Sequence, residues 1–506
     1  MYLVLVRMKG AMFLRFILHD NQLVPNASRE AKAISQLPEW YTPSVNPAFL
    51  FSSSLQQFLV GKQLLPDELT SFSFSTLHEH YEQGYIRYHK SIIKKDVMTC
   101  MRCGNQQQHL FASFHCGRCY STCTYCRACI GMGRVSECTP LITWKGPLLR
   151  KVSSPALTWK GKLSPAQQTA SSQMVEAVNS NQELLVWAVC GAGKTEVLFE
   201  GISKALGLGK SVCVATPRTD VVLELHPRLQ QAFQGLEVVA LYGGSADKGK
   251  HSSLILATTH QLLRYHEAFD VMIIDEVDAF PYSAEPMLQY ASNKARKAES
   301  TLIYLTATPS ENLKQQVKEN KLAAVKIPAR YHRYPIPIPR FVWCGNWQKR
   351  LVKKKLPFSI SSWIKQRVCD DKQCFVFVPK VKWVQPVVEL IQQLTPSVAG
   401  VHAEDKERKE KVKAFRERQY TILVTTTILE RGVTVPNIDV AVVGAENEIF
   451  TESALVQISG RVGRSANFPT GDVVFFHYGQ TVEMKKAKKH MVDMNDMAKK
   501  QGLIQI

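Results

Sequence analysis

A short apolar run that ends in a glycine-containing turn constrains the fold of this 506-residue chain more than any other feature. Residues 183–189 (Glu-Leu-Leu-Val-Trp-Ala-Val) are typical of a buried strand, and the turn Cys190-Gly-Ala-Gly-Lys-Thr195 follows at once. Backbone N–H groups in such a turn, together with the N-terminus of the next helix, bind phosphate groups. Lys194 would reach the β- and γ-phosphates, and the Thr195 hydroxyl would hold Mg²⁺. The predicted nucleoside triphosphate site consists of Ala188, Gly191, Ala192, Gly193, Lys194 and Thr195.

The composition is that of a globular protein with a large excess of positive charge. Apolar residues make up 45% of the chain and charged residues 21%, and the formal net charge at pH 7 is +20. At this length we expect two to four domains, each able to bury its own core. The charge favours a polyanionic partner, although solubility alone is the plainer explanation. Basic residues cluster at 349–355 and 485–489, where they form either a binding surface or solvated helix faces.

The N-terminal segment lacks the pattern of a signal peptide or a membrane span. Two apolar stretches, 1–6 and 12–18, are interrupted by Arg7, Lys9 and Arg15. A signal peptide carries its charge before the apolar core rather than through it, and neither stretch is long enough to cross a bilayer. We therefore expect short strands here, with a membrane anchor as the alternative. A cytoplasmic protein follows, in which cysteines stay reduced or bind metal.

Downstream of the phosphate-binding loop, buried strands alternate with helical stretches, as in a parallel α/β sheet. The segment Ile336-Pro-Ile-Pro339 cannot be helix interior and separates two sets of strands. Only the first set has a phosphate-binding loop, which suggests a nucleotide held between two α/β units. The expected strands are Ser211–Pro217, Leu254–Thr258, Val271–Asp275 and Thr301–Thr306 in the first set, and Cys374–Val378, Ile422–Val424, Asp439–Val443 and Asp472–Phe476 in the second.

The sequence therefore divides into five segments. Nothing in residues 1–95 indicates a particular chemistry, so we expect a small accessory region there, followed by a cysteine-rich module at 96–140. A linker at 141–160, which contains Ser153-Ser-Pro155, leads to the two α/β units. We expect these at 161–335 and 336–506.

Eight of the 13 cysteines lie between positions 100 and 138. Two Cys-x2-Cys pairs separated by twelve residues have the spacing of a tetrahedral Zn²⁺ site, and four further thiols suffice for a second ion. Because interleaved ligation is common when such pairs lie close together, the sequence leaves open which cysteines share an ion. A disulfide framework is the alternative, which a reducing cytoplasm disfavours. The expected zinc ligands are Cys100, Cys103, Cys116, Cys119, Cys123, Cys126, Cys129 and Cys138.

This cysteine-rich module is expected to be structural. Four thiolates around each ion leave no open coordination position for a substrate, and a module with little apolar core depends on metal for its fold. We expect one or two zinc ions. The module would then present its arginines, Arg102, Arg118, Arg127 and Arg134, to a partner.

Two further elements predict a site for phosphoryl transfer. Asp275-Glu-Val-Asp278 follows a predicted strand, where Asp275 could hold Mg²⁺ and Glu276 could orient and deprotonate the attacking water. In the second unit, Arg461 and Arg464 lie three residues apart, which predicts that they share one helical turn. Guanidinium groups stabilise charge on a transferring phosphoryl group, and such a finger from a facing domain is worth about 10³–10⁵ in rate.

Together these motifs resemble the superfamily-two helicases of the DEAD-box-like kind. The resemblance implies two RecA-like lobes that hydrolyse ATP with Mg²⁺ while moving on nucleic acid. It adds Gln167 as the glutamine that reads adenine, and Gln457 as part of the nucleotide site. The matches are motif I at Ala188–Thr195, motif II at Asp275–Asp278, motif III at Thr306–Thr308, motif V at Thr425–Thr427 with Glu430–Thr434, and motif VI at Gln457–Arg464.

The same resemblance implies contacts with the nucleic-acid backbone. Ala215–Arg218 and Thr258–His260 are similar to the two backbone-binding motifs of the first lobe, and motif V supplies those of the second. The implied contact residues are Pro217, Arg218, Thr258, Thr259, His260, Thr425, Thr426 and Arg431.

The order of the zinc module and the motor narrows the resemblance. Cys-x2-Cys knuckles, then Trp159-Lys-Gly161 and the phosphate-binding loop, are similar to the ComFA family of bacterial late-competence proteins over residues 95–480. That similarity implies a motor that draws transforming single-stranded DNA into the cell beside a membrane DNA channel, with ComFC as a partner and self-association open. The departures are Ala188 for the first glycine of the loop and Asp-Glu-Val-Asp for Asp-Glu-Ala-Asp.

Three alternatives remain. A replication-restart helicase of the PriA type also carries zinc, but there the cysteines interrupt the second lobe, whereas here all eight precede the phosphate-binding loop. An RNA-dependent DEAD-box ATPase shares the motor motifs. A zinc-dependent DNA-binding scaffold with a decayed motor would usually have lost Lys194, Glu276 or the arginines, all of which are present.

Overall fold

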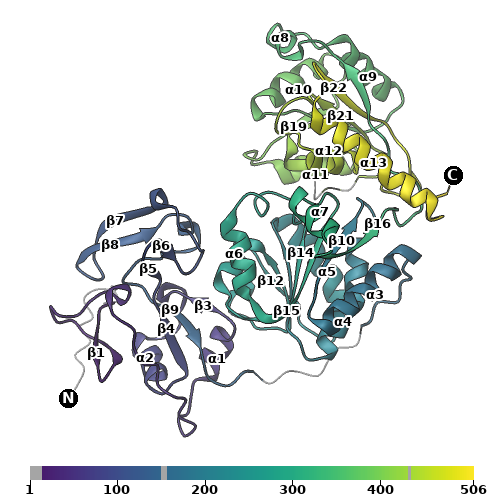
Figure 1. The fold of residues 1–506 in the computed structure, drawn as a ribbon. Helices are drawn as coiled ribbons and strands as arrows, with labels where there is room; N and C mark the ends of the chain where they lie inside the picture. Colours follow the sequence, from purple (N-terminus) through teal and green to yellow (C-terminus); the bar gives the residue numbers. More distant parts are fainter. Residues whose placement is uncertain (1–13, 150–156, 431–432, 434, 506) are drawn as a thin grey trace. The chain divides into compact units, whose positions relative to one another are not determined.

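The fold is taken from a computed structural model that describes residues 14–149, 157–430, 433 and 435–505 (Figure 1). The predictions for residues 1–6 and for Ser153–Pro155 lie outside the described residues. The chain packs into two compact units, which are not the two α/β units of the sequence: the phosphate-binding loop and the strands β10 (Glu183–Ala188) and β16 (Ala323–Ile327) of the first sheet fall in the second compact unit. The first comprises residues 1–159, 177–182 and 202–303, and the second 160–176, 183–201 and 304–506.

An antiparallel region lies on both sides of the cysteines along the chain, because its last strand, β9, follows them. It contains the hairpin β1–β2, two helices, and a three-stranded sheet in the order β3-β9-β4. Aromatic and aliphatic side chains such as Phe16, Tyr81 and Tyr88 form its core. The elements are β1 (Phe16–His19), β2 (Gln22–Pro25), α1 (Ser53–Leu59), β3 (Gln63–Leu64), α2 (Phe74–Glu82), β4 (Ile86–His89) and β9 (Leu141–Trp144).

The cysteines lie on and around two small hairpins between β4 and β9. One pairs β5 (Ile92–Lys94) with β6 (Met98–Cys100), and the other pairs β7 (Phe111–Cys116) with β8 (Ser121–Cys126). Hairpins this short bury little apolar surface, so they need another source of stability.

The first α/β sheet has seven strands in the order β12-β13-β11-β14-β15-β10-β16. The pairs β10–β16, β11–β13, β11–β14 and β12–β13 are parallel. Strands β11 and β13 are buried along their whole length, as expected where helices cover both faces of a sheet. The strands are β10 (Glu183–Ala188), β11 (Val212–Thr216), β12 (Val239–Leu241), β13 (Leu254–Thr258), β14 (Phe269–Asp275), β15 (Arg296–Thr306) and β16 (Ala323–Ile327).

Helices with local start signals accompany this sheet. Ser164 and Gln167 form a capping box at the start of α3, because the Ser164 N–H donates to Gln167 Oε1 at 2.8 Å and the Gln167 N–H donates to Ser164 Oγ at 3.4 Å. Ser310 caps α7 in the same position. The helices are α3 (Pro165–Ser180), α4 (Lys194–Gly207), α5 (Thr219–Ala232), α6 (Pro286–Ala295) and α7 (Glu311–Lys318).

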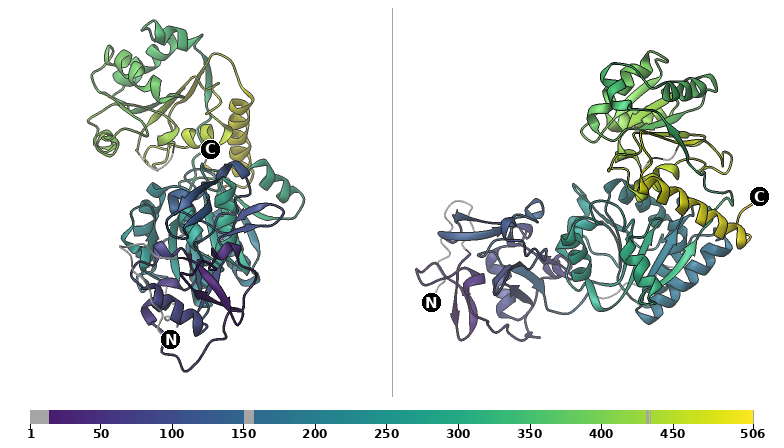
Figure 2. Two further views of the ribbon diagram at one scale, coloured as in Figure 1. Left: turned by 90° about the vertical axis from the view of Figure 1, so that its left-hand side faces the viewer. Right: turned by 45° about the horizontal axis from the view of Figure 1, so that its top comes forward.

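The second α/β sheet has six strands in the order β17-β22-β21-β18-β20-β19, and every pair is parallel. Its helices surround it on both sides (Figures 1 and 2). The strands are β17 (Arg340–Trp343), β18 (Cys374–Phe377), β19 (Val398–Val401), β20 (Ile422–Thr425), β21 (Asp439–Val443) and β22 (Val473–His477). The helices are α8 (Trp347–Val352), α9 (Phe358–Cys369), α10 (Val384–Gln392), α11 (Arg408–Arg416), α12 (Glu452–Ser459) and α13 (Val482–Lys500).

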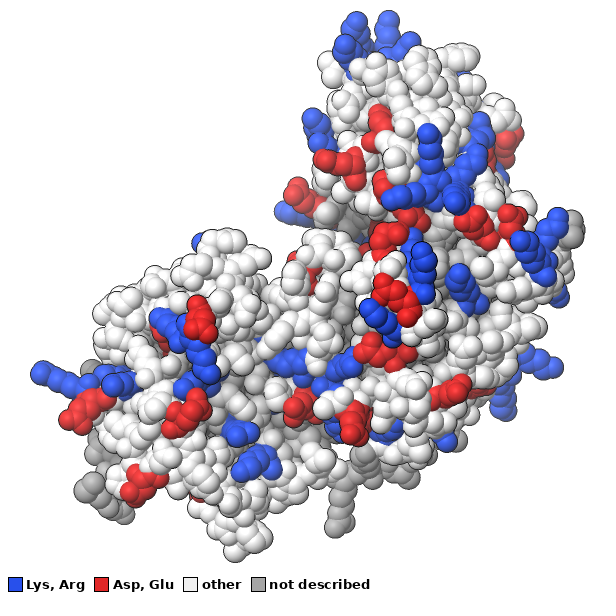
Figure 3. Space-filling view, viewed as in Figure 1, with Lys and Arg blue, Asp and Glu red and all other residues white. Residues whose placement is uncertain are grey.

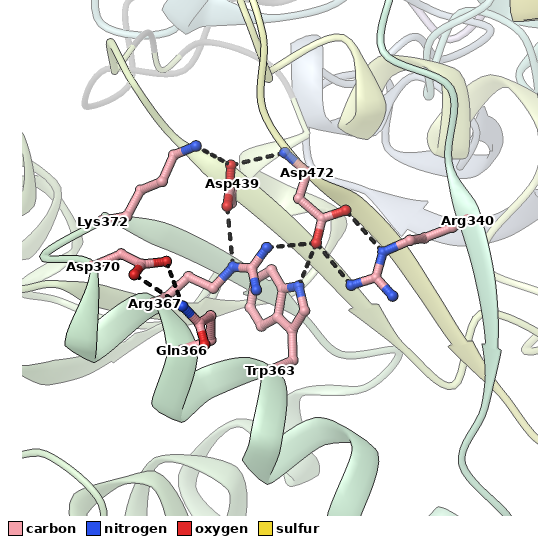
Figure 4. Close-up of polar contacts among 8 residues, drawn as sticks. All are labelled: Arg340, Trp363, Gln366, Arg367, Asp370, Lys372, Asp439 and Asp472. Carbon is pink, nitrogen blue, oxygen red and sulfur yellow. Dashed lines mark hydrogen bonds and ion pairs between the residues drawn. The ribbon is translucent and has the colours of Figure 1, made fainter.

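A polar network ties α9 to the start of β21 and β22 (Figure 4). Arg367 donates to Asp439 at 3.0 Å and to Asp472 at 2.5 Å. Asp472 also accepts from Trp363 Nε1 at 2.8 Å and from both Nε and Nη2 of Arg340 at 2.9 Å. These charge-assisted bonds fix the amino-terminal ends of two neighbouring strands.

The predicted fold class, two parallel-sheet α/β lobes after a cysteine-rich region, is confirmed. Each of the eight expected strands occurs, and Leu254–Thr258 and Asp439–Val443 have the predicted bounds. In the part of the chain that the structure describes, no helix combines the length and apolarity needed to cross a bilayer.

Candidate functional site

The phosphate-binding loop lies between β10, which ends at Ala188, and α4, which begins at Lys194. Gly191 has φ +81° and Gly193 has φ +71°, in the left-handed region that favours glycine. A Cβ on Gly193 would also lie 2.4 Å from Nε2 of Gln167. Only glycine fits there, so backbone N–H groups line the loop, as an anion site requires.

Gln167 touches this loop directly. Its Nε2 donates to the carbonyl oxygens of Ala192 at 2.8 Å and Gly193 at 3.3 Å, while its Oε1 is held by the capping box with Ser164. The structure therefore brings together the predicted adenine-reading glutamine and the predicted phosphate site. In this arrangement the amide of Gln167 also fixes the shape of the loop.

Motif VI contacts the same loop within the second unit. The Cys190 thiol donates to Oε1 of Gln457 at 3.1 Å, and a Cβ on Gly460 would lie 2.5 Å from Cys190 Cβ. Gly460 therefore permits a close approach that a larger residue would block. The Gln457–Arg464 segment thus lies against the loop that holds the predicted nucleotide.

Arg461 and Arg464 do not lie within a helix, so the prediction that they share one helical turn is wrong. Helix α12 ends at Ser459, and the chain then forms a turn in which Gly463 has φ +67°. Arg461 is 2% exposed and donates to the carbonyl oxygens of Glu430 and Val433. Arg464 Nε donates to the Gly460 carbonyl at 2.8 Å. Both side chains are thus held by backbone acceptors, and the acceptor of Arg464, Gly460, lies against the loop.

The two carboxylates of motif II belong to the first unit. Asp275 ends β14 and is buried, and Glu276 follows it with φ +59°. A positive φ for a glutamate is uncommon and occurs mostly where surrounding structure enforces it. A carboxylate at a strand end and the buried Thr195 hydroxyl are hard oxygen donors of the kind Mg²⁺ prefers.

Motif III connects to the second lobe through hydroxyl groups. The Thr308 hydroxyl donates to Oγ of Ser453 at 2.9 Å, and Thr306 Oγ1 accepts from the Thr308 N–H at 3.0 Å. Trp187 on β10 donates to the carbonyl of Ala307 at 3.0 Å. Motif III is thereby joined both to the strand that precedes the phosphate-binding loop and to α12.

The predicted backbone-binding residues lie at the carboxyl ends of strands. Arg218 follows β11 and forms a bidentate ion pair with Asp220, at 3.0 and 2.8 Å. Thr425 ends β20. Of the others, Pro217, Thr258, Thr259 and Thr426 are buried, His260 is partly exposed, and Arg431 lies outside the described residues.

The eight cysteines form two groups of four buried thiols, and all sulfur atoms of a group lie within 4.8 Å of one another. The first group is Cys100, Cys103, Cys126 and Cys129, and the second is Cys116, Cys119, Cys123 and Cys138. Distances between sulfur atoms across each group are 4.0 Å for Cys100–Cys129, 3.7 Å for Cys103–Cys126 and 3.7 Å for Cys116–Cys138. Four thiolates at this spacing fit a tetrahedral Zn²⁺ ion.

The grouping is interleaved along the chain. Cys100-x2-Cys103 groups with Cys126-x2-Cys129, and not with the nearer pair at 116 and 119. The hairpin β7–β8 explains this, because it folds back so that Cys116 and Cys126 mark its opposite ends. The sequence had left this pairing open.

The knuckle at Cys100–Gly104 packs against α6 within the first unit. A Cβ on Gly104, which has φ +72°, would lie 2.6 Å from the ring of Tyr290. Lys294 Nζ donates to the carbonyl oxygens of Arg102 and Leu263 and to Oε1 of Gln63, each at 3.0 Å. Sequence reasoning missed both residues of α6, because no local motif marks them.

Arg102 is not available to a partner, so that prediction is wrong. Its side chain is fully buried and donates to both carboxylate oxygens of Glu68 at 3.0 Å. Glu68 also accepts from Arg264 Nε at 2.6 Å. Of the other three arginines, Arg118 pairs with Asp67 at 2.8 Å, Arg134 lies over the Phe114 ring, and Arg127 is exposed.

Sequence reasoning also missed Arg330 and His332, which follow β16. Arg330 Nη1 donates to the carbonyl oxygen of Gly463 at 2.6 Å, and His332 Nε2 donates to the same oxygen at 2.9 Å. No motif of the resemblance includes them. The only signal in the sequence is that a basic segment directly follows the last strand of the first sheet.

A two-lobed parallel-sheet fold with this phosphate-binding loop, motif II and motif VI defines a superfamily-two helicase, an ATP-hydrolysing enzyme that uses Mg²⁺. Family models agree. The helicase conserved C-terminal domain matches residues 360–466, and the type III restriction enzyme res subunit matches 160–311. The competence protein ComFA N-terminal domain matches residues 45–143.

The chain belongs to the ComFA family of competence proteins. It is 53% identical over 451 residues to competence protein ComFA of Bacillus subtilis (strain 168), which covers 89% of this chain and 97% of the relative. It is 39% identical over 395 residues to ComFA of Streptococcus pneumoniae, a match that covers 76% of this chain and 90% of the relative.

A solved structure of RecG bound to a three-way DNA junction aligns with 68% of this chain and with 47% of the RecG chain, at 20% identity and a TM-score of 0.47.

Proposed function

We propose that this protein is an ATP-dependent translocase on single-stranded DNA that drives uptake of transforming DNA during competence. The observation that carries the proposal is the contact between the phosphate-binding loop and motif VI, Cys190 to Gln457, in a chain of the ComFA family. A loop that holds the triphosphate and a facing turn with two arginines are the parts that couple hydrolysis to movement of a helicase.

Each site residue has a distinct task in this proposal. The N–H groups of Gly191–Gly193 and the ammonium of Lys194 bind the phosphates, and Gln167 contacts the adenine side of the nucleotide. Thr195 and Asp275 would hold Mg²⁺, which would supply positive charge to the phosphates. Glu276 orients and deprotonates the attacking water. Arg461 and Arg464 stabilise charge on the transferring phosphoryl group, once their backbone contacts are exchanged for phosphate.

The decisive experiment is ATP hydrolysis in the presence of poly-dT, duplex DNA or RNA. We expect poly-dT to stimulate turnover most. Stimulation by RNA alone would decide for an RNA-dependent ATPase, and stimulation by forked duplex but not by poly-dT would favour a replication-restart helicase. No hydrolysis under any condition would favour the DNA-binding scaffold. With every nucleic acid that supports hydrolysis, Lys194→Ala should reduce turnover at least about 100-fold, because the phosphates lose their cation.

DNA should be gripped mainly through its phosphates, since a motor that tracks any sequence cannot depend on bases. The proposed contacts are Pro217, Arg218, Thr258, Thr259, His260, Thr425, Thr426 and Arg431. Affinity for poly-dT should fall with salt, with a slope in a log–log plot near −0.7 for each phosphate neutralised. A flat dependence would contradict tracking along DNA.

A basic surface near α8 is available for such a polyanion. Figure 3 shows Lys and Arg side chains gathered at the end of the C-terminal lobe where Figure 1 labels α8. Lys349, Arg350, Lys353, Lys354 and Lys355 are all exposed there. Removing these charges should weaken binding of poly-dT if they contact DNA, and should leave it unchanged if they are only solvated.

We also propose that the two thiol groups each hold one structural Zn²⁺ ion. The support is the interleaved set of eight buried thiols, since four thiolates per ion leave no open position. Elemental analysis of the purified protein should give two zinc ions per chain. A value of one zinc ion per chain would mean that one of the two groups of thiols holds no metal.

The ComFA family suggests where this motor acts. We propose that it works in the cytoplasm beside the membrane DNA channel, with ComFC as a partner. Co-purification of ComFC with the full chain from competent cells, and its loss when the zinc module is deleted, would support that assignment. Size-exclusion chromatography with light scattering would decide whether the chain self-associates.

A further inference from the structure

Arg330 is a buried arginine that no helicase motif of this chain includes. It follows β16 by three residues, lies within the second unit, and is 1% exposed. Arginine is rarely buried without a partner that repays the loss of water. Its surroundings therefore indicate what it does.

The aliphatic part of Arg330 lies on the phosphate-binding loop. A Cβ built on Gly191 would lie 3.6 Å from Cγ, 3.8 Å from Cδ and 3.9 Å from Nε of Arg330, which is van der Waals contact. The next residue strengthens this junction, because the Tyr331 N–H donates to the Gly191 carbonyl at 3.2 Å. The segment after β16 is thus attached to the loop by both backbone and side chain.

The guanidinium of Arg330 reaches the turn that carries the motif VI arginines. Its Nη1 donates to the Gly463 carbonyl at 2.6 Å, and His332 Nε2 donates to the same oxygen at 2.9 Å. His332 Nδ1 accepts from the Tyr334 N–H at 3.2 Å, which fixes the tautomer with the proton on Nε2. Two donors on one carbonyl hold Gly463, the residue directly before Arg464.

The backbone of Gly463 has little freedom to change its conformation in response to these two hydrogen bonds. Its φ is +67°, and a Cβ there would lie 2.2 Å from the carbonyl oxygen of Pro469. The position of the carbonyl therefore determines the path of the backbone into Arg464. A small displacement of Arg330 would move that path.

An ordinary structural ion pair does not account for Arg330. Among the described residues no carboxylate pairs with it, and its Nε and Nη2 have no hydrogen-bond partner. Burial lowers the pKa of Arg330 to about 10, so the side chain remains charged at neutral pH. A charge that is buried without an acid, and next to the cation of Arg464, costs stability rather than adding to it. Such a residue is retained for function more readily than for folding.

We propose that Arg330 is a positioning residue of the ATP site: it joins the phosphate-binding loop at Gly191 to the Gly463 carbonyl and so sets where Arg464 meets the transferring phosphoryl group. This inference rests on the proposed roles of the motif VI arginines. It assigns Arg330 no direct contact with the nucleotide.

The test compares Arg330→Gln with Arg333→Gln in the full chain. Arg333 is a matched control because it is exposed, lies three residues further on, and its side chain donates to the carbonyl oxygens of Gly502 and Leu503. We expect Arg330→Gln to lower kcat for ATP at least about tenfold, whereas Arg333→Gln stays within about twofold of the wild type. Arg330→Lys, which keeps the charge and one donor, should recover part of the loss.

A second readout separates positioning from loss of structure. Binding of ADP should be unchanged in Arg330→Gln, because the loop itself is intact. Binding of ADP with aluminium fluoride, which mimics the transferring phosphoryl group, should weaken at least about tenfold, because Arg464 is displaced. Equal weakening of both ligands, or kcat within twofold of the wild type, would overturn the proposal. If Arg330→Gln fails to fold, the same pair of affinities for Arg330→Lys decides.

The same assays distinguish failure of this inference from failure of the proposed function. If Arg464→Gln hydrolyses ATP normally, the assignment of the motif VI arginines is wrong. If ATP hydrolysis is impaired in Arg464→Gln but not in Arg330→Gln, only the proposed role of Arg330 is wrong.

Discussion

The thiol of Cys190 donates a hydrogen bond of 3.1 Å to the side-chain carbonyl of Gln457, a residue 267 positions further along the chain. One partner belongs to the phosphate-binding loop and the other to motif VI. The contact is buried, and buried polar groups are costly when they lose a partner. It therefore gives the loop and motif VI a preferred alignment.

Replacing Gln457 should impair hydrolysis through this alignment. Gln457→Ala leaves the Cys190 thiol without its acceptor, and we expect kcat for ATP to fall about tenfold. Cys190→Ser keeps a donor and should stay within about threefold of the wild type. Steady-state ATPase assays with poly-dT measure both, and Gln501→Ala, an exposed glutamine near the C-terminus, is the control. Equal effects of Gln457→Ala and Gln501→Ala would show that the contact has no role.

The interleaved zinc groups can be tested by counting metal in double variants. Cys103→Ser and Cys126→Ser remove ligands from the same group, so we expect each single variant and the double variant to lose one ion. Cys103→Ser with Cys119→Ser should lose both ions. Cys369→Ser, at an exposed cysteine outside the groups, should lose none. Loss of both ions in the first double variant would contradict the observed grouping.

The packing of the zinc knuckle on α6 predicts a cost for removing Lys294. Lys294→Ala leaves three acceptors, on Gln63, Arg102 and Leu263, without their donor. Unpaired buried acceptors cost about 1–3 kcal/mol, so the thermal midpoint of the first unit should fall by several degrees. Lys318→Ala, on an exposed position of α7, should leave the midpoint unchanged. Calorimetry measures the midpoints, and an unchanged midpoint for Lys294→Ala would show that the knuckle docks weakly.

Asp472 predicts acid sensitivity of the C-terminal lobe. Burial raises the pKa of this carboxyl, but hydrogen bonds from Arg340 and Trp363 and the charges of Arg340 and Arg367 outweigh burial, and the net pKa lies below its ordinary value. A carboxyl whose pKa is lower in the folded state contributes stability above the unfolded pKa of about 3.9, and loses it as the pH falls through the folded pKa.

Replacing Asp472 should remove that pH dependence. Asp472→Asn should destabilise the lobe by about 1–3 kcal/mol at pH 7, because Arg340 and Arg367 lose a charged acceptor. The difference from the wild type should begin to shrink below about pH 4 and should continue to shrink as the pH falls through the lower folded pKa, because the wild-type carboxyl then becomes neutral as well. Denaturant titrations at several pH values measure it. A difference that stays constant down to pH 3 would contradict the role of the carboxylate (Figure 4).

Much of the motor could be predicted because its signals are local. Strand β13 is buried at every position and apolar at all but Thr258, a pattern typical of a strand covered on both faces, and its predicted bounds are those observed. The turn after β10 needs glycine at 191 and 193 for backbone reasons that act within a few residues. The arginines of motif VI were misplaced in a helix because α12 ends at Ser459, before both of them, and the chain then turns through Gly463 with its positive φ.

The zinc region shows where local signals stop. Each Cys-x2-Cys pair is a local turn and was recognised, but the return of the β7–β8 hairpin selects the partner pair. The sequence predicted that Arg102 would be exposed to a partner. In the structure its side chain is buried because it pairs with Glu68, 34 positions away. The spacing of residues along the chain does not show which distant residues come into contact in the folded protein.

From the amino-acid order alone come the glycine-containing turn after β10, the alternation of strands and helices in both lobes, and the recognition of the eight thiols as candidate metal ligands. These features follow from the steric and solvation preferences of residues that are neighbours in the sequence, and such preferences act before the chain has folded. Folding decided which thiols share a site, that Cys190 meets Gln457, and that Arg330 reaches Gly463. Those contacts join segments 22 to 267 residues apart, and only packing of whole elements brings such segments together.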